Sequence, residues 1–192
     1  MSRPKAEQEP TPIPTIWTIG HSTRSIEEFI DLLKGAGIRS LIDVRRFPAS
    51  RRYPHFNGPS LAESLKDAGI RYQHIPALGG RRPSRSDSPN IGWRNAGFRG
   101  YADYMQTDEF CGALEELMGR AHSLGPTVIM CAEAVPWRCH RNLISDALVI
   151  RGWRVLHMLS AKRIDTHTLT SFAQVSGHKL LYPSDLNQPS LF

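Results

Sequence analysis

The sequence lacks a long apolar run, a secretion signal and a glycine-rich nucleotide loop. No stretch reaches the roughly 18–20 consecutive apolar residues that a membrane-spanning helix needs, so we expect no contact with a membrane. The N-terminal segment MSRPKAEQEP has no apolar core like that of a signal peptide, and we therefore expect a cytoplasmic protein. Neither a Gly-x-Gly-x-x-Gly pattern nor a Walker-type loop follows an apolar segment, so no motif indicates a nucleotide cofactor.

Cysteine is scarce as well. The chain has three cysteines, and an odd count without an export signal indicates free thiols or metal ligands rather than a disulfide framework. Cys111 falls on the apolar face of an expected helix, where a small core residue is the simplest interpretation. Cys131 and Cys139 fall in a polar stretch with other reactive side chains, so we assign both to a candidate site.

Lysine is also rare, and arginine supplies most of the positive charge. Of 24 basic residues in the 192-residue chain, 19 are arginine, and the net charge is +6. Ten of these arginines fall within residues 39–52 and 81–99. Because arginine forms bidentate contacts with phosphate, two such clusters indicate a basic face for a polyanion. An arginine-rich codon usage is the alternative explanation.

Short apolar segments alternate with amphipathic helical patterns along the chain. Strands are expected over residues 16–20, 40–44, 71–75, 127–130 and 153–159. Helices are expected behind capping boxes at residues 25–28 and 60–63, and over 107–124, 136–150 and 168–174. This alternation predicts an α/β fold, a Rossmann-like three-layer sandwich with a mainly parallel sheet of about five strands.

The expected domain organisation is simple. With 40% hydrophobic residues, the chain suits one domain with a core, placed at residues 15–176. Residues 1–14 contain four prolines and are expected to be a disordered arm, and residues 177–192 to be a flexible tail. Residues 77–99 have no hydrophobic period and are expected to form a long arginine-rich loop, which in a compact domain is usually functional or mobile.

Reactive residues fall where the expected strands end. In parallel sheets, ligand sites lie outside the carboxyl ends of the strands. His21 follows the first expected strand, Asp43 lies in the second near its end, and Cys131 and Glu133 follow the fourth. We expect His21 to serve in acid–base chemistry. Asp43 would bind a metal, orient a base or pair with Arg45.

The densest group of reactive residues is the segment 131–141, CAEAVPWRCHR. Residues 139–141 would lie in the first turn of a helix, where the helix N-terminus lowers the pKa of nearby thiols. One hypothesis makes Cys131 an activated thiolate, with His140 as base or proton donor and Glu133 as its orienting partner.

A metal site is the alternative use of the same segment, in which one divalent metal ion would be the cofactor. The candidate ligands are Cys131, Glu133, Cys139 and His140.

Phosphate or substrate contacts would come from hydroxyl and guanidinium groups near the same edge. The candidates are Ser22, Arg45, Arg46, Arg51, Arg81, Arg82 and Arg141. Ser22 could instead cap a helix, and the arginines could form a solvated face.

These motifs together resemble a known family. The motifs are Gly20-His-Ser22, Asp43-Val-Arg45 with Phe47-Pro-x-Ser-Arg51, Leu78-Gly-Gly80, and Cys131-x-Glu133 with Cys139-His-Arg141. Over roughly residues 15–160, they are similar to the DUF488 family of prokaryotic proteins. The resemblance implies a small Rossmann-like α/β domain and no established reaction. The segment 41–45 (LIDVR) also resembles the opening of rhodanese sulfurtransferases, but their glycine-containing active loop is missing here.

The last five residues, QPSLF, carry a separate signal. They are similar to the Gln-x-x-Leu-Phe peptides by which bacterial polymerases and repair proteins bind the β sliding clamp. Gln188, Leu191 and Phe192 would supply a polar contact and two apolar anchors to a hydrophobic pocket. A chance sequence that folds back on its own core is the alternative.

The leading hypothesis from the sequence is an enzyme, a hydrolase or a transferase, acting on nucleic acid or on a phosphate-bearing, nucleotide-like compound. The clamp-like tail would recruit it to DNA. The first alternative is a thiol-dependent small-molecule enzyme that carries sulfur or an acyl group on Cys131. The second is a non-catalytic nucleic-acid-binding protein.

Overall fold

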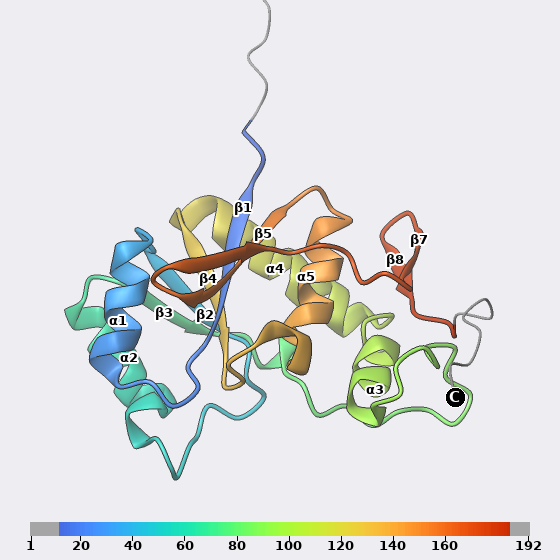
Figure 1. Cartoon of the computed structure of the whole chain (residues 1–192), viewed down its shortest axis with the longest axis horizontal. Coiled ribbons are helices and arrows are strands. Elements are labelled where there is room, and N and C mark those ends of the chain that lie inside the picture. The colour runs from blue at the N-terminus through green and yellow to red at the C-terminus, as the bar shows by residue number, and fades with distance from the viewer. Residues whose placement is uncertain (1–11, 185–192) are drawn as a thin grey trace, which may run out of the picture.

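The structure is a computed structural model that describes residues 12–184 (Figure 1). Most of the expected N-terminal arm and the clamp-like residues 188–192 lie outside the described residues.

A six-stranded sheet forms the centre of the molecule. Its strands are β1 (Thr15–Gly20), β2 (Ser40–Asp43), β3 (Arg71–His74), β4 (Thr127–Cys131), β5 (Arg154–Ser160) and β6 (Arg163–Thr166). They lie in the order β3-β2-β4-β1-β5-β6. The first five are parallel, and β6 runs antiparallel to β5 at the edge. The predicted Rossmann-like α/β fold is confirmed, with six strands in place of about five.

Helices cover both faces of this sheet. α1 (Ile26–Gly35) and α2 (Gly58–Asp67) pack on one face, and α4 (Asp108–Leu124) and α5 (Arg141–Val149) on the other, with α3 (Ala96–Tyr104) beside them (Figure 1). β2 and β4 are buried along their whole length, as expected for parallel strands covered on both faces. Two clusters of buried apolar side chains, one on each side of the sheet, form the core.

The helix starts follow local capping rules, with one correction. The capping box of α1 is confirmed, because Ser25 and Glu28 each accept a hydrogen bond from the backbone N–H of the other. The expected capping box at residue 60 is wrong, because α2 already begins at Gly58. Pro59 lies in its first turn, where proline's fixed φ favours a helix start, so Ser60 lies inside the helix.

The entry to α5 also differs from the prediction of one helix over residues 136–150. Pro136–Arg138 form a single 3-10 turn, and Cys139 then adopts an extended backbone with φ −135° and ψ 145°. His140 is the N-cap residue, and α5 begins at Arg141. Of residues 139–141, only Arg141 therefore lies in the first turn of α5. The extended backbone at Cys139 separates the 3-10 turn from α5.

The expected loop over residues 77–99 is shorter than the sequence pattern suggested. A 3-10 turn occupies Pro76–Leu78, and α3 begins at Ala96. Asn95 caps α3, since its side-chain oxygen accepts hydrogen bonds from the N–H groups of Gly97 and Phe98.

The C-terminal part contains a hairpin in place of the expected helix over residues 168–174. β7 (Gln174–Ser176) pairs with β8 (Lys179–Leu181), and Gly177 between them has φ 59°, the left-handed conformation that glycine adopts readily. Tyr182 is fully buried beyond the hairpin. Ordered structure therefore continues past residue 177, where the tail was expected to begin.

Within residues 12–184, none of the helices has the length and apolar character needed to cross a bilayer.

The substitution Gly20→Ala tests how closely the chain packs at the carboxyl end of β1. A Cβ atom there would lie 1.8 Å from the carbonyl oxygen of Glu133. We expect Gly20→Ala to lower the free energy of unfolding by about 3 kcal/mol, because the backbone of residue 133 would have to move. Urea unfolding measures the loss. Gly35→Ala is the matched control, since a Cβ there meets no atom within 4 Å and the helix gains by removal of a glycine. Equal stability of both variants would contradict this packing.

Candidate active site

The carboxyl ends of three strands bring the reactive segments together. Gly20 at the end of β1 is paired with Cys131 at the end of β4, and Asp43 of β2 is paired with Met130. The contact continues one residue beyond β1, because the N–H of His21 donates a hydrogen bond to the carbonyl of Cys131 at 2.9 Å. The residues at the carboxyl ends of β1, β2 and β4 therefore lie in one region of the sheet edge, as we expected from their positions at the ends of the predicted strands.

Two thiols and one imidazole meet at this edge. The Sγ atoms of Cys131 and Cys139 and the Nδ1 atom of His140 all lie within 4.8 Å of one another. Cys139 Sγ is 3.7 Å from His140 Nδ1. The extended backbone at residue 139 permits this arrangement of adjacent side chains, which a continuous helix would have turned apart.

A backbone carbonyl orients the imidazole of His140. Nε2 of His140 lies 3.0 Å from the carbonyl oxygen of Val44, just after β2. Since a carbonyl only accepts, Nε2 carries a proton, and Nδ1 is the ring atom that faces Cys139. Gly80 allows this placement, because a Cβ on it would lie 2.9 Å from Nδ1.

Arg141 brings a buried positive charge to the same sulfur. Its residue is 1% exposed, and Nε donates to Cys139 Sγ at 3.4 Å. Its Nη1 donates to Thr18 Oγ1 at 3.2 Å, and Nη2 donates to the carbonyl of Glu133. Within residues 12–184, no carboxylate forms an ion pair with this guanidinium. A buried charge needs compensation, and Cys139, which would be an anion as a thiolate, is the ionisable group in contact with it.

The surroundings give the two thiols opposite properties. Burial raises the pKa of Cys139, but the hydrogen bond from Cys131 and the charges of Arg141 and His140 together hold it well below its usual value. The hydrogen bond to Cys139, together with burial, raises the pKa of Cys131 well above its usual value. The sequence favoured Cys131 as the activated thiol, whereas the charges in the structure favour Cys139, with Cys131 as a protonated neighbour.

Glu133 does not take the role expected for it. Its side chain is exposed and belongs to neither the thiol cluster nor the hydrogen bonds of His140. The carbonyl of Val44 orients His140 instead, and Glu133 contributes its backbone carbonyl to Arg141. Three of the four candidate metal ligands, Cys131, Cys139 and His140, therefore lie together. Two thiolates and an imidazole suit a soft divalent ion such as zinc, but the guanidinium beside Cys139 disfavours a second cation there.

His21 is held as a buried, neutral imidazole. Burial lowers its pKa to about 4, and its ring stacks on Phe56 with centroids 4.3 Å apart. Nδ1 lies 3.0 Å from the carbonyl oxygen of Ser22 and so carries the proton. Nε2 is left with a lone pair, and this buried atom has no hydrogen-bond partner among the described residues. The group has the form of a general base.

Asp43 and Arg45 form a buried ion pair. Both carboxylate oxygens of Asp43 accept from the Arg45 side chain at 2.6–3.0 Å, and the Tyr72 hydroxyl also donates to the carboxylate at 2.9 Å. Burial lowers the pKa of Arg45, but the hydrogen bonds and charge of Asp43 outweigh it, so the net direction is upward. The pairing alternative for Asp43 thus describes its contacts. Arg45 Nη1 remains buried without a partner among the described residues.

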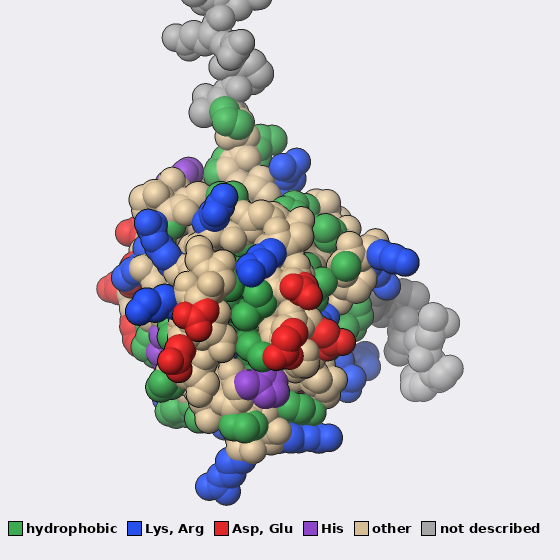
Figure 2. All heavy atoms as spheres, turned by 90° about the vertical axis from the view of Figure 1, so that its left-hand side faces the viewer, with side chains coloured by type: hydrophobic (Ala, Val, Ile, Leu, Met, Phe, Trp, Pro, Cys, Tyr) green, Lys and Arg blue, Asp and Glu red, His purple; other side chains and the backbone are tan. Residues whose placement is uncertain are grey.

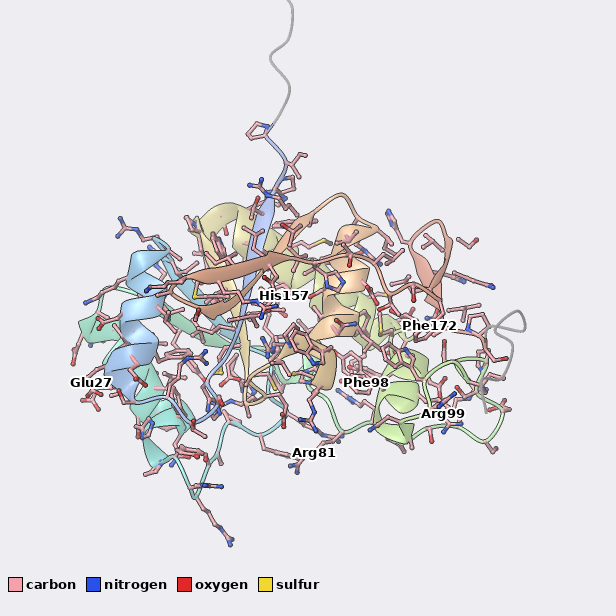
Figure 3. The ribbon with its side chains drawn as sticks, viewed as in Figure 1. Glu27, Arg81, Phe98, Arg99, His157 and Phe172 are labelled. Atoms are coloured by element: carbon pink, nitrogen blue, oxygen red, sulfur yellow. The ribbon has the colours of Figure 1, made fainter. Side chains whose placement is uncertain are left out.

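The remaining candidates for phosphate contacts differ in how far their side chains are exposed to solvent. Arg46, Arg51 and Arg81 are exposed, and Arg46 Nη1 donates to the carbonyl of Arg81 at 2.8 Å, which joins two loops at the sheet edge. Figure 3 shows Arg81 below the sheet, away from the core. Arg82 lies over the ring of Tyr104 and donates to backbone carbonyls, and Ser22 donates its N–H to Ala132. The buried Arg45 and Arg141 do not form part of an exposed phosphate-binding face.

Basic side chains do not predominate on the face of the molecule that carries α1. Figure 2 shows acidic and basic side chains side by side on it. A groove of about 660 Å³ lies between α1 and the β5–β6 edge, lined by residues such as Trp17, Leu32 and Ile164. None of the cysteines lines this groove, so we do not assign it to the thiol chemistry.

A buried hydrogen-bond chain leads away from Arg141. Thr18 Oγ1 accepts from Arg141 and lies 2.8 Å from His157 Nδ1. His157 Nε2 lies 2.9 Å from His167 Nδ1, and His167 Nε2 lies 2.8 Å from Asp146 Oδ1. One assignment satisfies every link: each group donates to the next, from Arg141 to the Asp146 carboxylate.

The far end of this chain is firmly held. Asp146 also accepts from the N–H and hydroxyl of Thr170 and from the hydroxyl of Tyr182 at 2.7–3.0 Å. Burial, together with smaller contributions from His167 and Arg141, lowers the pKa of His157 to about 3, so the ring is neutral at pH 7. Figure 3 shows His157 at the centre of the fold.

This hydrogen-bond chain was not identified from the sequence. Its members are far apart along the chain and follow no motif. The sequence offered one weak signal, a polar residue within each of two largely apolar strands. These residues are Thr18 and His157, which lie opposite each other where β1 pairs with β5.

Comparison with known proteins gives one finding. The model of the family described as "Domain of unknown function DUF488" matches residues 25–148, about two thirds of the chain. The matched part includes Asp43, both clustered cysteines and Arg141, whereas His21, His157 and His167 lie outside it. No curated protein and no solved structure matches the chain.

Thr18 offers a test of the hydrogen-bond chain. Thr18→Val keeps the shape of the side chain but leaves Arg141 Nη1 and His157 Nδ1 without their shared partner. We expect a loss of about 2 kcal/mol in the free energy of unfolding, measured with urea, because two buried polar groups become unpartnered. Thr18→Ser retains the hydroxyl and should lose clearly less. If the serine variant is as unstable as the valine variant, the hydroxyl contributes nothing.

Proposed function

Because the chain belongs to the DUF488 family, whose description names no reaction, we propose its function from the site itself: a thiol-dependent enzyme in which the Cys139 thiolate attacks a small electrophilic substrate. This proposal develops the thiol-dependent alternative from the sequence and moves the nucleophile from Cys131 to Cys139. The observation that carries it is the buried Arg141, whose Nε contacts Cys139 Sγ and which pairs with no carboxylate among the described residues.

The two neighbours of the sulfur suit nucleophilic catalysis. Arg141 stabilises the thiolate, and His140 presents Nδ1 toward the same atom. In the proposed reaction the Cys139 sulfur forms a bond to the electrophilic atom, the bond to the leaving group breaks, and His140 exchanges a proton with the thiol or the leaving group. Sulfur transfer and acyl transfer both fit this scheme.

Burial favours a small substrate. Cys139 is 3% exposed and Cys131 is 8% exposed, so a nucleic-acid strand has no access to either sulfur without rearrangement. Two buried groups at the same sheet edge, His21 Nε2 and Arg45 Nη1, have no partner among the described residues and offer one acceptor and one donor. Buried polar atoms without partners are costly, and a polar ligand would satisfy them.

The pH dependence of thiol alkylation tests this proposal. We expect iodoacetamide to modify Cys139 at pH 7 about tenfold or more faster than Cys111, because a lowered pKa gives Cys139 a larger fraction of the reactive thiolate. The rate should stay flat as the pH falls from 8 and decline only below that lowered pKa. Peptide mass spectrometry at a series of pH values gives the rate for each cysteine separately.

Variants assign the cause of this reactivity. Arg141→Gln and His140→Gln should each move the inflection for Cys139 upward, by about one pH unit or more for Arg141, since Arg141 and His140 both lower the pKa of Cys139. Cys111 supplies the internal control in every sample. If the alkylation rate of Cys139 in the wild type inflects near the pKa of a free thiol, the proposal is wrong. If Cys139 is protected from alkylation until a chelator is added, the metal alternative is favoured.

Binding of a polyanion is a second candidate function, supported by the exposed arginines at the sheet edge. Arg46 and Arg81 are joined by a hydrogen bond, and Arg51 lies in the same loop as Arg46. These residues would hold phosphate groups of a nucleic acid or of a small substrate. Recruitment by the sliding clamp through Gln188, Leu191 and Phe192 stays a prediction, because these residues lie outside the described part.

Salt dependence tests the polyanion hypothesis. With duplex DNA as the probe, the slope of log affinity against log salt should fall by about 2 in the double variant Arg46→Ala, Arg81→Ala, since each arginine releases about one counterion. Arg163→Ala is the matched control, because Arg163 is exposed but pairs with Asp165 on the β6 edge. Binding that is absent, or a slope that the double variant leaves unchanged, would rule out this rim as a nucleic-acid contact.

A further inference from the structure

The second thiol of the cluster has no part in the proposed attack by Cys139. Cys131 ends β4, and its Sγ lies within 4.8 Å of Cys139 Sγ. The two sulfur atoms are close enough for each cysteine to shift the pKa of the other. Both cysteines are free in this structure. A thiolate beside a second thiol is the arrangement found in redox-active cysteine pairs.

We propose that Cys139 and Cys131 form a dithiol that reduces small hydroperoxides: the peroxide oxidises Cys139, and Cys131 then closes an intramolecular disulfide with it. This activity rests on the proposed thiolate at Cys139 and adds a substrate class and a role for Cys131. It also sets the order of events, since the contact with Arg141 marks Cys139 as the first sulfur to react.

The two steps balance. In the first, the Cys139 thiolate attacks one peroxide oxygen, an S–O bond forms, the O–O bond breaks, and hydroxide leaves and takes up a proton to become water. In the second, the Cys131 sulfur attacks the Cys139 sulfenic acid, an S–S bond forms, the S–O bond breaks, and the departing hydroxide becomes water with the Cys131 proton. Two thiols supply two electrons to one peroxide, which yields two waters.

The first step prepares Cys131 for the second. The hydrogen bond to Cys139 and the negative charge on that sulfur both raise the pKa of Cys131, in addition to burial. The influence of the negative charge ends when Cys139 becomes a neutral sulfenic acid. Arg141, whose charge lowers the pKa of Cys131, stays in place. Oxidation of Cys139 therefore favours ionisation of Cys131 at the moment when it must attack.

Burial restricts the oxidant and Arg141 favours the return to the dithiol. With both sulfurs less than a tenth exposed, hydrogen peroxide and other small hydroperoxides reach them more easily than bulky oxidants do. Closing the disulfide removes the anion that compensates Arg141. A disulfide whose reduced form is stabilised in this way is readily reduced, so we expect a small dithiol to regenerate the site.

The experiment treats the full-length, reduced protein with one equivalent of hydrogen peroxide. Peptide mass spectrometry should find a disulfide linking Cys131 to Cys139, and dithiothreitol should reverse it. In Cys131→Ser, the sulfenic acid on Cys139 should persist and be trapped by dimedone. In Cys139→Ser, the rate of peroxide consumption should fall about tenfold or more. Cys111→Ser, which removes a cysteine outside the cluster, should behave as the wild type.

The outcomes separate this inference from the proposed function. If Cys139 is alkylated rapidly at pH 7 but peroxide yields no Cys131–Cys139 disulfide, the dithiol proposal is wrong and the nucleophilic role of Cys139 stands. If Cys139 is neither alkylated rapidly nor oxidised, both fall. If the disulfide forms equally in Cys111→Ser and wild type and disappears in both other variants, the proposal holds.

Discussion

The buried guanidinium of Arg141 is the constraint around which the sheet edge is organised. A charge of this kind is tolerated inside a protein only when nearby groups compensate it and accept its hydrogen bonds. Here the acceptors come from three places in the chain: Cys139 two residues before it, the backbone of Glu133, and Thr18 in β1. The proposed thiolate at Cys139 would meet this need, since it brings a negative charge into contact with the guanidinium.

The same requirement links the thiol cluster to the far side of the fold. Arg141 donates to Thr18, and His157 and His167 carry the hydrogen bonding on to Asp146, which Thr170 and Tyr182 also hold. Several of these residues lie outside the stretch that matches the family model. The C-terminal segment, with its buried Tyr182, thus supports the orientation of a residue whose charge sets the reactivity of Cys139.

The two thiol proposals share one physical origin, unequal charge around two neighbouring sulfurs. Arg141 and His140 lie beside Cys139, and their charges favour its ionisation, while the hydrogen bond from Cys131 keeps the second thiol protonated. This inequality distinguishes a nucleophile from a resolving partner. The exposed arginines belong to a different layer of the molecule, the loops at the edge of the sheet, where they remain free to contact anionic groups.

The sequence by itself determined the α/β fold, most strands and the positions where chemistry gathers, because hydrophobic period and strand ends are local properties. It could not assign roles within the cluster. Cys131 and Cys139 differ through the contacts of Arg141, which depend on the extended backbone at residue 139 and on the pairing of β1 with β4. Tertiary structure alone also decided that Arg45 is buried in an ion pair, and that Thr18, His157 and His167 join into one chain. Hydrogen bonds between distant segments leave no period in the sequence, and burial converts them into differences in charge and reactivity.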